Sequence, residues 1–305
     1  MSFTPQRAVE IVAGTPPGGG LDRSARALLE AINASRLLDV PASVVNIGGE
    51  GGRRAWRAIR ERGHDPHVIG ISSPNAIADR LMGVTQEDPD EFSPIAILYT
   101  EYIAFVVRAD SPLRGGAHLV HRLTQDAASV TVALSTSLGN SNHVAVAIVV
   151  REAGADTRAP TIRVFDSALD AVADVVAGHA DVGAITAASA VTELEAGTLS
   201  AIAVSAPARL PGIYAATPTW REQSIDCIVG SWRGVSGPPG LHAHQVAFWE
   251  RVLTAAVATP QWKARMVRHF WTGMLLTGDT LSRHLQGERR EMETVLGTLG
   301  LLSPR

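Results

Sequence analysis

The chain has 305 residues, of which 46% are hydrophobic and 19% are charged, and its formal net charge at neutral pH is −3. The length suits two compact domains, and the composition is that of a globular protein, which excludes a disordered or fibrous chain. The slightly acidic balance disfavours a general nucleic-acid binder, because neutralising phosphates requires a basic face.

The N-terminal third alternates short apolar runs with helical patterns, which is typical of α/β proteins with a mostly parallel sheet. We expect Asp22 to cap the first helix, whose apolar positions include Ala25, Leu28 and Ile32. Strands are expected at residues 8–13, 40–45, 68–72, 95–99 and 103–107, with glycine-rich turns at 14–20 and 48–52.

The same order of elements then repeats. Strands are expected at 130–134, 161–164, 181–185 and 199–204, with helices at 143–152 and 167–177. Residues 225–229 and those that follow run back toward a Pro/Gly turn at 237–240, and helices at 244–258, 260–268 and 280–299 complete the chain. Two similar halves predict two lobes, residues 1–107 with 228–305 forming the first and residues 108–227 an inserted second. A cleft between lobes is a favoured site for small ligands.

The loop Gly14–Asp22 carries the clearest indication of a binding site. It leaves a strand, turns on Gly18, Gly19 and Gly20, and leads into a helix. Free N–H groups in the first turn of a helix, together with its dipole, form an anion site that needs no lysine. The alternative is a tight strand-to-helix turn without a ligand. Neither a Walker loop nor a dinucleotide fingerprint fits these residues.

Two further polar segments follow expected strands. Ser135–His143 contains hydroxyl and amide side chains at a second helix start, and Ser72–Asn75 ends the third strand. Carboxyl ends of parallel strands are where open α/β sheets bind ligands. A Ser/Asn-rich capped turn is the alternative for Ser135–His143. Trp232 near a crossover and Asp166 before a helix are each open between a ligand contact and a structural role.

No other group of residues in the sequence predicts a catalytic or metal site. Ser141 and His143 do not form a nucleophile elbow, and pairs such as His118 and His121 lack further metal ligands at suitable spacing. We expect Trp249, Trp262 and Trp271 to be core residues. Cys227, the single cysteine, is expected to be a buried structural thiol.

The order of segments resembles the tripartite tricarboxylate transporter receptors, also called the Bug family of extracytoplasmic solute receptors. The resemblance spans nearly the whole chain. The matching pieces are Ile11–Asp22, Val45–Asn46 with Gly48–Gly52, Ser72–Asn75, Ala133–His143, Gly178–Asp181, Ala196–Leu199, Thr217–Thr219 and Ser231–Trp232. Where the family has Tyr-Lys-Gly-Gly, this chain has Phe165–Ala168, so the wall of the pocket differs there. The family's secretion signal is also missing before Val9.

The resemblance implies a two-lobed periplasmic-binding-protein (Venus-flytrap) fold, each lobe a mostly parallel sheet flanked by helices. It implies a monomeric, periplasmic receptor that uses no cofactor or metal and hands a small carboxylate to the membrane subunits of a tripartite transporter. Composition alone leaves cytoplasm and periplasm open. The expected ligand contacts are Thr15, Pro17, Gly18, Gly19, Gly20, Asp22, Ser72, Ser73, Asn75, Ser135, Ser137, Gly139, Asn140, Ser141, His143, Phe165, Asp166, Thr186 and Trp232.

The sequence leaves the ligand open among dicarboxylates, tricarboxylates, acidic amino acids and aromatic acids. A ligand-sensing module or signalling receptor of the same two-lobed fold is the first alternative function. An α/β enzyme is the second, and it would require a nucleophile–base pair or cofactor motif that the sequence does not display.

Overall fold

The computed structural model describes residues 3–303, which form two compact units. Unit 1 contains the chain up to Thr100 together with Trp232–Glu293, and unit 2 contains Glu101–Ser231 together with the residues from Thr294 onward. The expected limits at 107/108 and 227/228 differ from these limits by a few residues, and they stay a prediction.

Unit 1 is built on a mixed sheet with the order β2-β1-β3-β9-β4, to which β10 adds by pairing with β4. The three N-terminal strands are parallel, whereas β9 is antiparallel to β3 and β10 is antiparallel to β4. The strands are β1 (Val9–Ala13), β2 (Ala42–Asn46), β3 (Val68–Ser72), β4 (Ser93–Arg108), β9 (Gly230–Gly237) and β10 (Thr272–Leu276).

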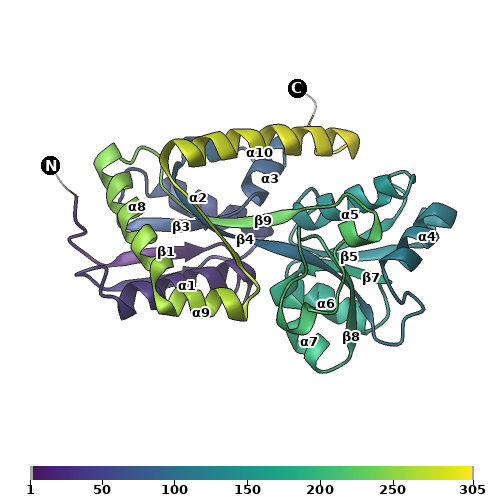
Figure 1. Cartoon of the computed structure of the whole chain (residues 1–305). Coiled ribbons are helices and arrows are strands. Elements are labelled where there is room, and N and C mark those ends of the chain that lie inside the picture. Colours follow the sequence, from purple (N-terminus) through teal and green to yellow (C-terminus); the bar gives the residue numbers. More distant parts are fainter. Residues whose placement is uncertain (1–2, 304–305) are drawn as a thin grey trace. The chain divides into compact units, whose positions relative to one another are not determined.

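Helices cover both faces of this sheet, as Figure 1 shows. Along β1, Val9, Ile11 and Ala13 belong to one apolar cluster with α1, α8 and α9, while Val12 packs with α2 on the other face. This alternation is what the two-residue period of a strand dictates. The helices are α1 (Gly20–Ala34), α2 (Arg53–Glu61), α3 (Asn75–Leu81), α8 (Ala243–Ala258), α9 (Pro260–Arg268) and α10 (Gly278–Thr298), with short 3-10 helices at Glu50–Gly52 and Pro89–Glu91.

The tryptophans of the C-terminal helical region lie in the core of unit 1, as expected. Trp249 and Trp262 are fully buried and Trp271 nearly so, and Trp271 stacks on Tyr99 with 4.0 Å between ring centroids. Tyr99 also makes an edge contact with Trp262. These large side chains attach the C-terminal segments to the sheet through apolar burial.

Unit 2 has the same kind of layering. Strand β5 lies between β6 and β7 and is parallel to both, and β4 pairs antiparallel with β7 and β8. Figure 1 shows α5 on one face of this sheet and α6 on the other. The further elements are β5 (Thr131–Ser135), β6 (Thr161–Phe165), β7 (Val182–Thr186), β8 (Leu199–Val204), α4 (Gly116–Asp126), α5 (Ser141–Glu152), α6 (Ala168–Val176) and α7 (Val191–Glu195), with 3-10 helices at Ala127–Ser129, Ala187–Ser189, Gly212–Tyr214 and Arg221–Gln223.

Several expected elements are different in the structure. The two strands expected at 95–99 and 103–107 are one strand, β4, because the polar residues between them continue the extended chain and Glu101 is buried. In the run that starts at Ile225, the strand is β9, which begins at Gly230 and ends at Gly237. The last helix begins at Gly278, and the Thr280 hydroxyl donates to the carbonyl of Thr277 instead of capping the helix.

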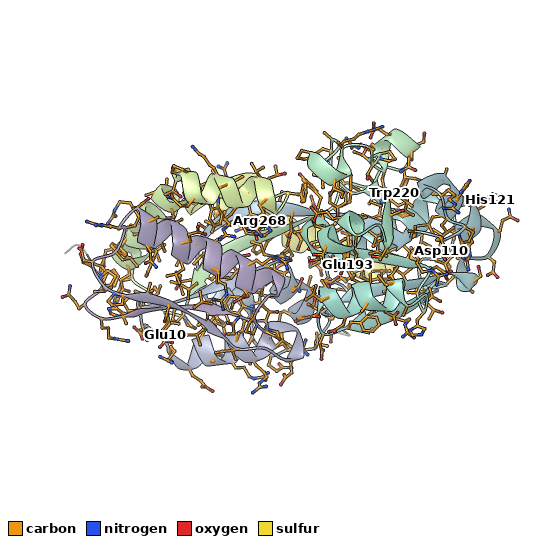
Figure 2. All side chains as sticks on the ribbon, turned by 90° about the horizontal axis from the view of Figure 1, so that it is seen from below. Glu10, Asp110, His121, Glu193, Trp220 and Arg268 are labelled. Atoms are coloured by element: carbon orange, nitrogen blue, oxygen red, sulfur yellow. The ribbon has the colours of Figure 1, made fainter. Side chains whose placement is uncertain are left out.

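Two smaller expectations concern exposure. Cys227 is buried, and burial raises the pKa of its thiol to about 12, so the thiol is un-ionised at neutral pH. His118 and His121 are exposed on α4, and Figure 2 labels His121 at the surface of unit 2. Within residues 3–303, no helix combines the length and the apolar character that crossing a membrane requires.

Candidate functional site

The loop between β1 and α1 is held in shape by Asp22. Its Oδ2 accepts hydrogen bonds from the Gly18 N–H at 2.8 Å and from Arg26 Nε at 2.9 Å, and its Oδ1 accepts one from Asn46 Nδ2 at 2.9 Å. Burial by itself would raise the pKa of Asp22, but the hydrogen bonds from Arg26, Gly18 and Asn46 outweigh it and lower the pKa. The ionised Asp22 carboxylate therefore stabilises the conformation of the loop.

The expectation that Asp22 caps α1 is wrong. Helix α1 begins at Gly20, its N-cap is Gly19, and Asp22 lies inside the first turn. Asp22 is also only 2% exposed. Its negative charge in the first turn is still favourable to the helix, because it lies near the positive end of the helix dipole.

Glycines let this loop pack against the loop before α2. A Cβ on Gly14 would lie 3.2 Å from the Cα of Gly52, and a Cβ on Gly48 would lie 3.0 Å from the Pro16 ring. Gly52 has a φ of +98°, which other residues rarely adopt. Contact between the two loops thus explains Gly14, Gly48 and Gly52 without a ligand, whereas a Cβ on Gly18 or Gly20 would meet open space or arginine nitrogens.

The N–H groups of the loop are not equally available. Those of Gly18 and Gly19 already donate, to Asp22 Oδ2 and to the Pro16 carbonyl. The N–H groups of Gly20, Leu21 and Asp22 have no hydrogen-bond partner among the described residues. The anion-binding capacity expected for Gly18–Asp22 therefore lies at its helical end.

Two guanidinium groups stand beside this helix start. A Cβ placed on Gly20 would be 3.8 Å from a terminal nitrogen of Arg233 and 3.9 Å from one of Arg23. Arg233 is 9% exposed and donates from Nη1 to the Trp232 carbonyl at 3.1 Å. Positive side chains next to the positive end of a helix favour an anion between them.

The remaining predicted residues of unit 1 lie near one another. Ser72, Ser73, Asn75 and Trp232 all line one cavity of unit 1, with Ser72 at the end of β3 and Asn75 at the start of α3. Ser72, Ser73 and Trp232 are each less than 9% exposed. Thr15 and Pro17 lie instead in the β1–α1 loop, where Thr15 is half-buried and Pro17 is exposed.

The corresponding loop of unit 2, between β5 and α5, is organised by Asn140. Its side-chain oxygen accepts from the His143 N–H at 3.1 Å, which makes it the N-cap of α5. Its Nδ2 donates to the Ser135 carbonyl and the Thr136 hydroxyl. The Ser135 hydroxyl accepts from Asn142 Nδ2 at 3.1 Å. Asn140 and Ser135 therefore fix the loop's conformation.

His143 has a defined protonation state. Its Nδ1 accepts from the Gly139 N–H at 3.0 Å, and burial lowers the pKa of the ring to about 4. The ring is thus neutral at pH 7, and its proton is on Nε2. A ring held in this way can donate from Nε2 but is a poor base, which argues against a Ser141–His143 nucleophile pair.

Ser137 differs from its neighbours. Its hydroxyl oxygen is buried and has no hydrogen-bond partner in the described part of the chain. The N–H groups of Ser141 and Asn142, in the first turn of α5, also have no partner within residues 3–303. Unit 2 therefore has a second helix start with unused donors, together with a buried hydroxyl in the same loop.

Phe165, Asp166 and Thr186 follow neighbouring strands of unit 2. Phe165 ends β6, and Asp166 is exposed and does not cap α6, because the N-cap is Ser167, whose hydroxyl accepts from the Asp170 N–H. Thr186 ends β7, and its hydroxyl lies 3.0 Å from that of Ser189. None of these geometries assigns a ligand contact.

Three residues with roles in these loops were not among the expected ligand contacts. Asn46 donates to both Asp22 and the Thr15 carbonyl, Asn142 donates to Ser135, and Arg233 lies beside Gly20. Asn46 could have been found, because it directly follows the second expected strand. Arg233 is 213 positions from Gly20, and no local pattern connects them.

Two α/β units, each with unused donors at a helix N-terminus, are an arrangement suited to binding a small anionic solute. The chain belongs to the tripartite tricarboxylate transporter family of receptors, whose family model matches residues 26–297. The family consists of solute-binding receptors and not of enzymes. No protein among the curated ones matches the chain.

Solved structures share the fold across almost the whole chain. MatC from Rhodopseudomonas palustris with bound malate is 22% identical, covering 96% of this chain and 99% of its own, with a TM-score of 0.80. A protein of R. palustris with adipate is 21% identical, covering 99% of both chains, with a TM-score of 0.87. The periplasmic binding protein BugD is 20% identical, covering 98% and 100%, with a TM-score of 0.84. The two-lobed periplasmic-binding-protein fold is thereby confirmed.

Proposed function

We propose that this protein is a periplasmic receptor that captures a small carboxylate and delivers it to the membrane subunits of a tripartite tricarboxylate-type transporter. Family membership supports the receptor role, and similar structures named as periplasmic support the location. Malate and adipate in two similar proteins make dicarboxylates the first ligands to test.

The start of α1 carries this proposal. Gly20, Leu21 and Asp22 offer N–H donors without partners among the described residues, and the guanidinium groups of Arg233 and Arg23 lie beside Gly20. Donors and positive charge converge here without a lysine, which suits a carboxylate. We propose that unit 2 binds the ligand's other end through Ser137 and the first turn of α5.

A thermal-shift screen with mono-, di- and tricarboxylates and acidic amino acids tests the receptor role. A ligand that binds only the folded state raises stability by RT ln(1 + [L]/Kd), which is about 2.7 kcal/mol at a hundredfold excess over Kd. We expect at least one carboxylate to raise the melting temperature saturably. If no member of the panel does so at millimolar concentration, the proposal fails.

The position of the anion is tested by Gly20→Val, assayed by calorimetry with the carboxylate that the screen identifies. The new side chain fits, because a Cβ there has no contact shorter than 3.8 Å, but it occupies the space between the helix start and Arg233. We expect a loss of affinity of about tenfold or more, the effect of displacing one charge-assisted hydrogen bond.

Gly115→Val is the matched control. Gly115 is the N-cap of α4, its backbone is extended with a φ of 176°, and a Cβ there meets nothing within 4 Å. This control should keep its affinity, while its melting temperature should fall only slightly because valine caps a helix less well than glycine. Equal affinity in the two variants would remove α1 from the site while leaving the receptor role intact.

A further inference from the structure

A cavity of about 280 Å³ lies inside unit 1, and one of its lining residues, Leu21, also belongs to the α1 start that we assign to the carboxylate. Residues of α2, α3, β4, β9 and α10 line it. Much of its wall is apolar, including Trp56, Ile77, Phe92, Leu281 and Leu285. A cavity of roughly 150 Å³ with such walls can hold benzene. This one is large enough for a substituted aromatic ring.

One buried carboxylate faces this cavity. Asp79, on α3, is 2% exposed and lines the cavity. Its Oδ2 accepts from Arg53 Nη1 at 3.3 Å, while its Oδ1 has no hydrogen-bond partner among residues 3–303. A buried acceptor without a partner is costly, so its persistence indicates a donor that the chain itself does not supply.

The other charges on the wall also favour a donor over an acceptor. Glu87 and Asp90 line the cavity together with Asp79, against Arg53 and Arg289. The Arg289 guanidinium already binds Asp90 at 2.9 Å and Asp88 at 3.2 Å. The Thr85 hydroxyl donates to Glu87. Three carboxylates against two guanidinium groups make the wall net negative, which repels a second carboxylate.

We infer that this cavity binds a small apolar primary amine, whose ring or chain lies against Trp56, Phe92 and Leu285 and whose ammonium group donates to Asp79 Oδ1. The ammonium group supplies both the missing hydrogen bond and the compensating charge. The cavity shares residues such as Leu21 and Ser72 with the carboxylate contacts, but this inference rests on Asp79 and Leu285, which are not assigned to the anion.

Calorimetric titration of the whole protein with benzylamine at pH 7.5 tests the inference, with benzoate as a probe of the same size and opposite charge. We expect saturable binding of benzylamine in the millimolar range or tighter, and no benzoate binding that filling the cavity with Leu285→Trp would remove. Leu285→Trp, which fills the cavity, should abolish benzylamine binding. Asp79→Asn, which keeps the size of the side chain, should weaken it about tenfold, as expected for removing a hydrogen bond to a charged group.

Val267→Trp is the control for inserting a tryptophan, because Val267 is 73% exposed on α9 and lies outside the cavity. It should bind benzylamine like the wild type. If Leu285→Trp does not fold, as judged by circular dichroism, Asp79→Asn decides alone. Benzoate binding that Leu285→Trp abolishes, no binding of benzylamine, or unchanged benzylamine binding in Asp79→Asn would each overturn the inference. Carboxylate binding in Leu285→Trp, measured in parallel, reports separately on the proposed function.

Discussion

Two buried aspartates of unit 1 show how the surroundings of a residue decide its role. Asp22 accepts hydrogen bonds from Gly18, Arg26 and Asn46, which lower its pKa and fix the conformation of the β1–α1 loop. Asp79 has one long contact to Arg53, so burial dominates and raises its pKa from 3.8 to about 6. The same side chain therefore stabilises the fold at one position and destabilises it at the other.

Asp79→Asn should stabilise the protein in a pH-dependent way. Between pH 3.8 and about 6 the unfolded Asp79 loses its proton while the folded one keeps it, so wild-type stability falls as pH rises through this window. Two pKa units correspond to about 3 kcal/mol as an upper limit. We expect urea unfolding to show the variant more stable at pH 7 and the difference to vanish near pH 4. A constant difference across this range would contradict the argument.

Ser137→Ala removes a single hydroxyl group and should change the affinity for the carboxylate without lowering stability. The hydroxyl oxygen is buried without a partner among the described residues, so its removal should leave the free energy of unfolding unchanged or slightly higher. Affinity for the carboxylate should fall about tenfold, since a hydrogen bond to a charged group is worth about 1.5–3 kcal/mol. Ser200→Ala, at an exposed position on β8, is the control and should change neither quantity.

At the scale of elements, the two helix starts were predictable and their contacts were not. The glycines before α1 and the Ser/Asn segment before α5 identify strand-to-helix turns by their residue types alone. The Gly18 and Gly19 N–H groups are used within the loop, because folding brings the Asp22 carboxylate and the Pro16 carbonyl next to them. A local pattern reports which residues can donate, but folding decides which of them remain free to do so.

For the strands too, the positions were predictable from the sequence but the pairing was not. The parallel strands β1, β3 and β5 follow from apolar runs between turn residues, and their bounds agree with the expected ones to within a residue or two. Strand β4 was expected as two strands because Thr100, Glu101 and Tyr102 interrupt its apolar pattern. Its two halves pair with different partners, β10 and then β7 and β8, and such long-range pairing leaves no local trace in the sequence.

The N-cap of α5 should be needed for both folding and binding. Asn140→Ala removes the cap and the anchor to Ser135, so we expect a loss of about 1–2 kcal/mol in unfolding free energy and a lower carboxylate affinity. Thr259→Ala removes the N-cap of α9, where the hydroxyl accepts from the Trp262 N–H. It should lose similar stability and keep full affinity. A normal affinity in Asn140→Ala would mean that the α5 start does not contact the ligand.

At the scale of the whole molecule, the chain passes between the units at Thr100–Glu101, at Ser231–Trp232 and again within α10 at Glu293–Thr294. The sequence predicted two passages, and the third was not expected because α10 reads as one uninterrupted helix. A few residues at such passages can absorb the rotation of one rigid body against another.

We predict that the carboxylate favours a closed form without being changed chemically, because a ligand bound by donors of both units stabilises whichever arrangement lets both bind it. Small-angle scattering should give a smaller radius of gyration with saturating ligand than without it. NMR of the recovered ligand should show it intact after prolonged incubation. Conversion of the ligand would contradict the receptor function. A Gly20→Val protein, at a ligand concentration that half-saturates the wild type, is the control and should show a smaller decrease of the radius than the wild type does.

The placement of the six tryptophans gives the protein a built-in optical reporter. Trp56 and Trp232 line the cavity of unit 1, whereas Trp220, Trp249, Trp262 and Trp271 are buried in apolar cores. Half-buried Trp56 is the indole most open to solvent at the cavity. A guest that displaces water from it would shift the emission to shorter wavelength, while the four core indoles supply a constant background. Occupancy of the cavity is therefore readable from intrinsic fluorescence, without attaching a dye.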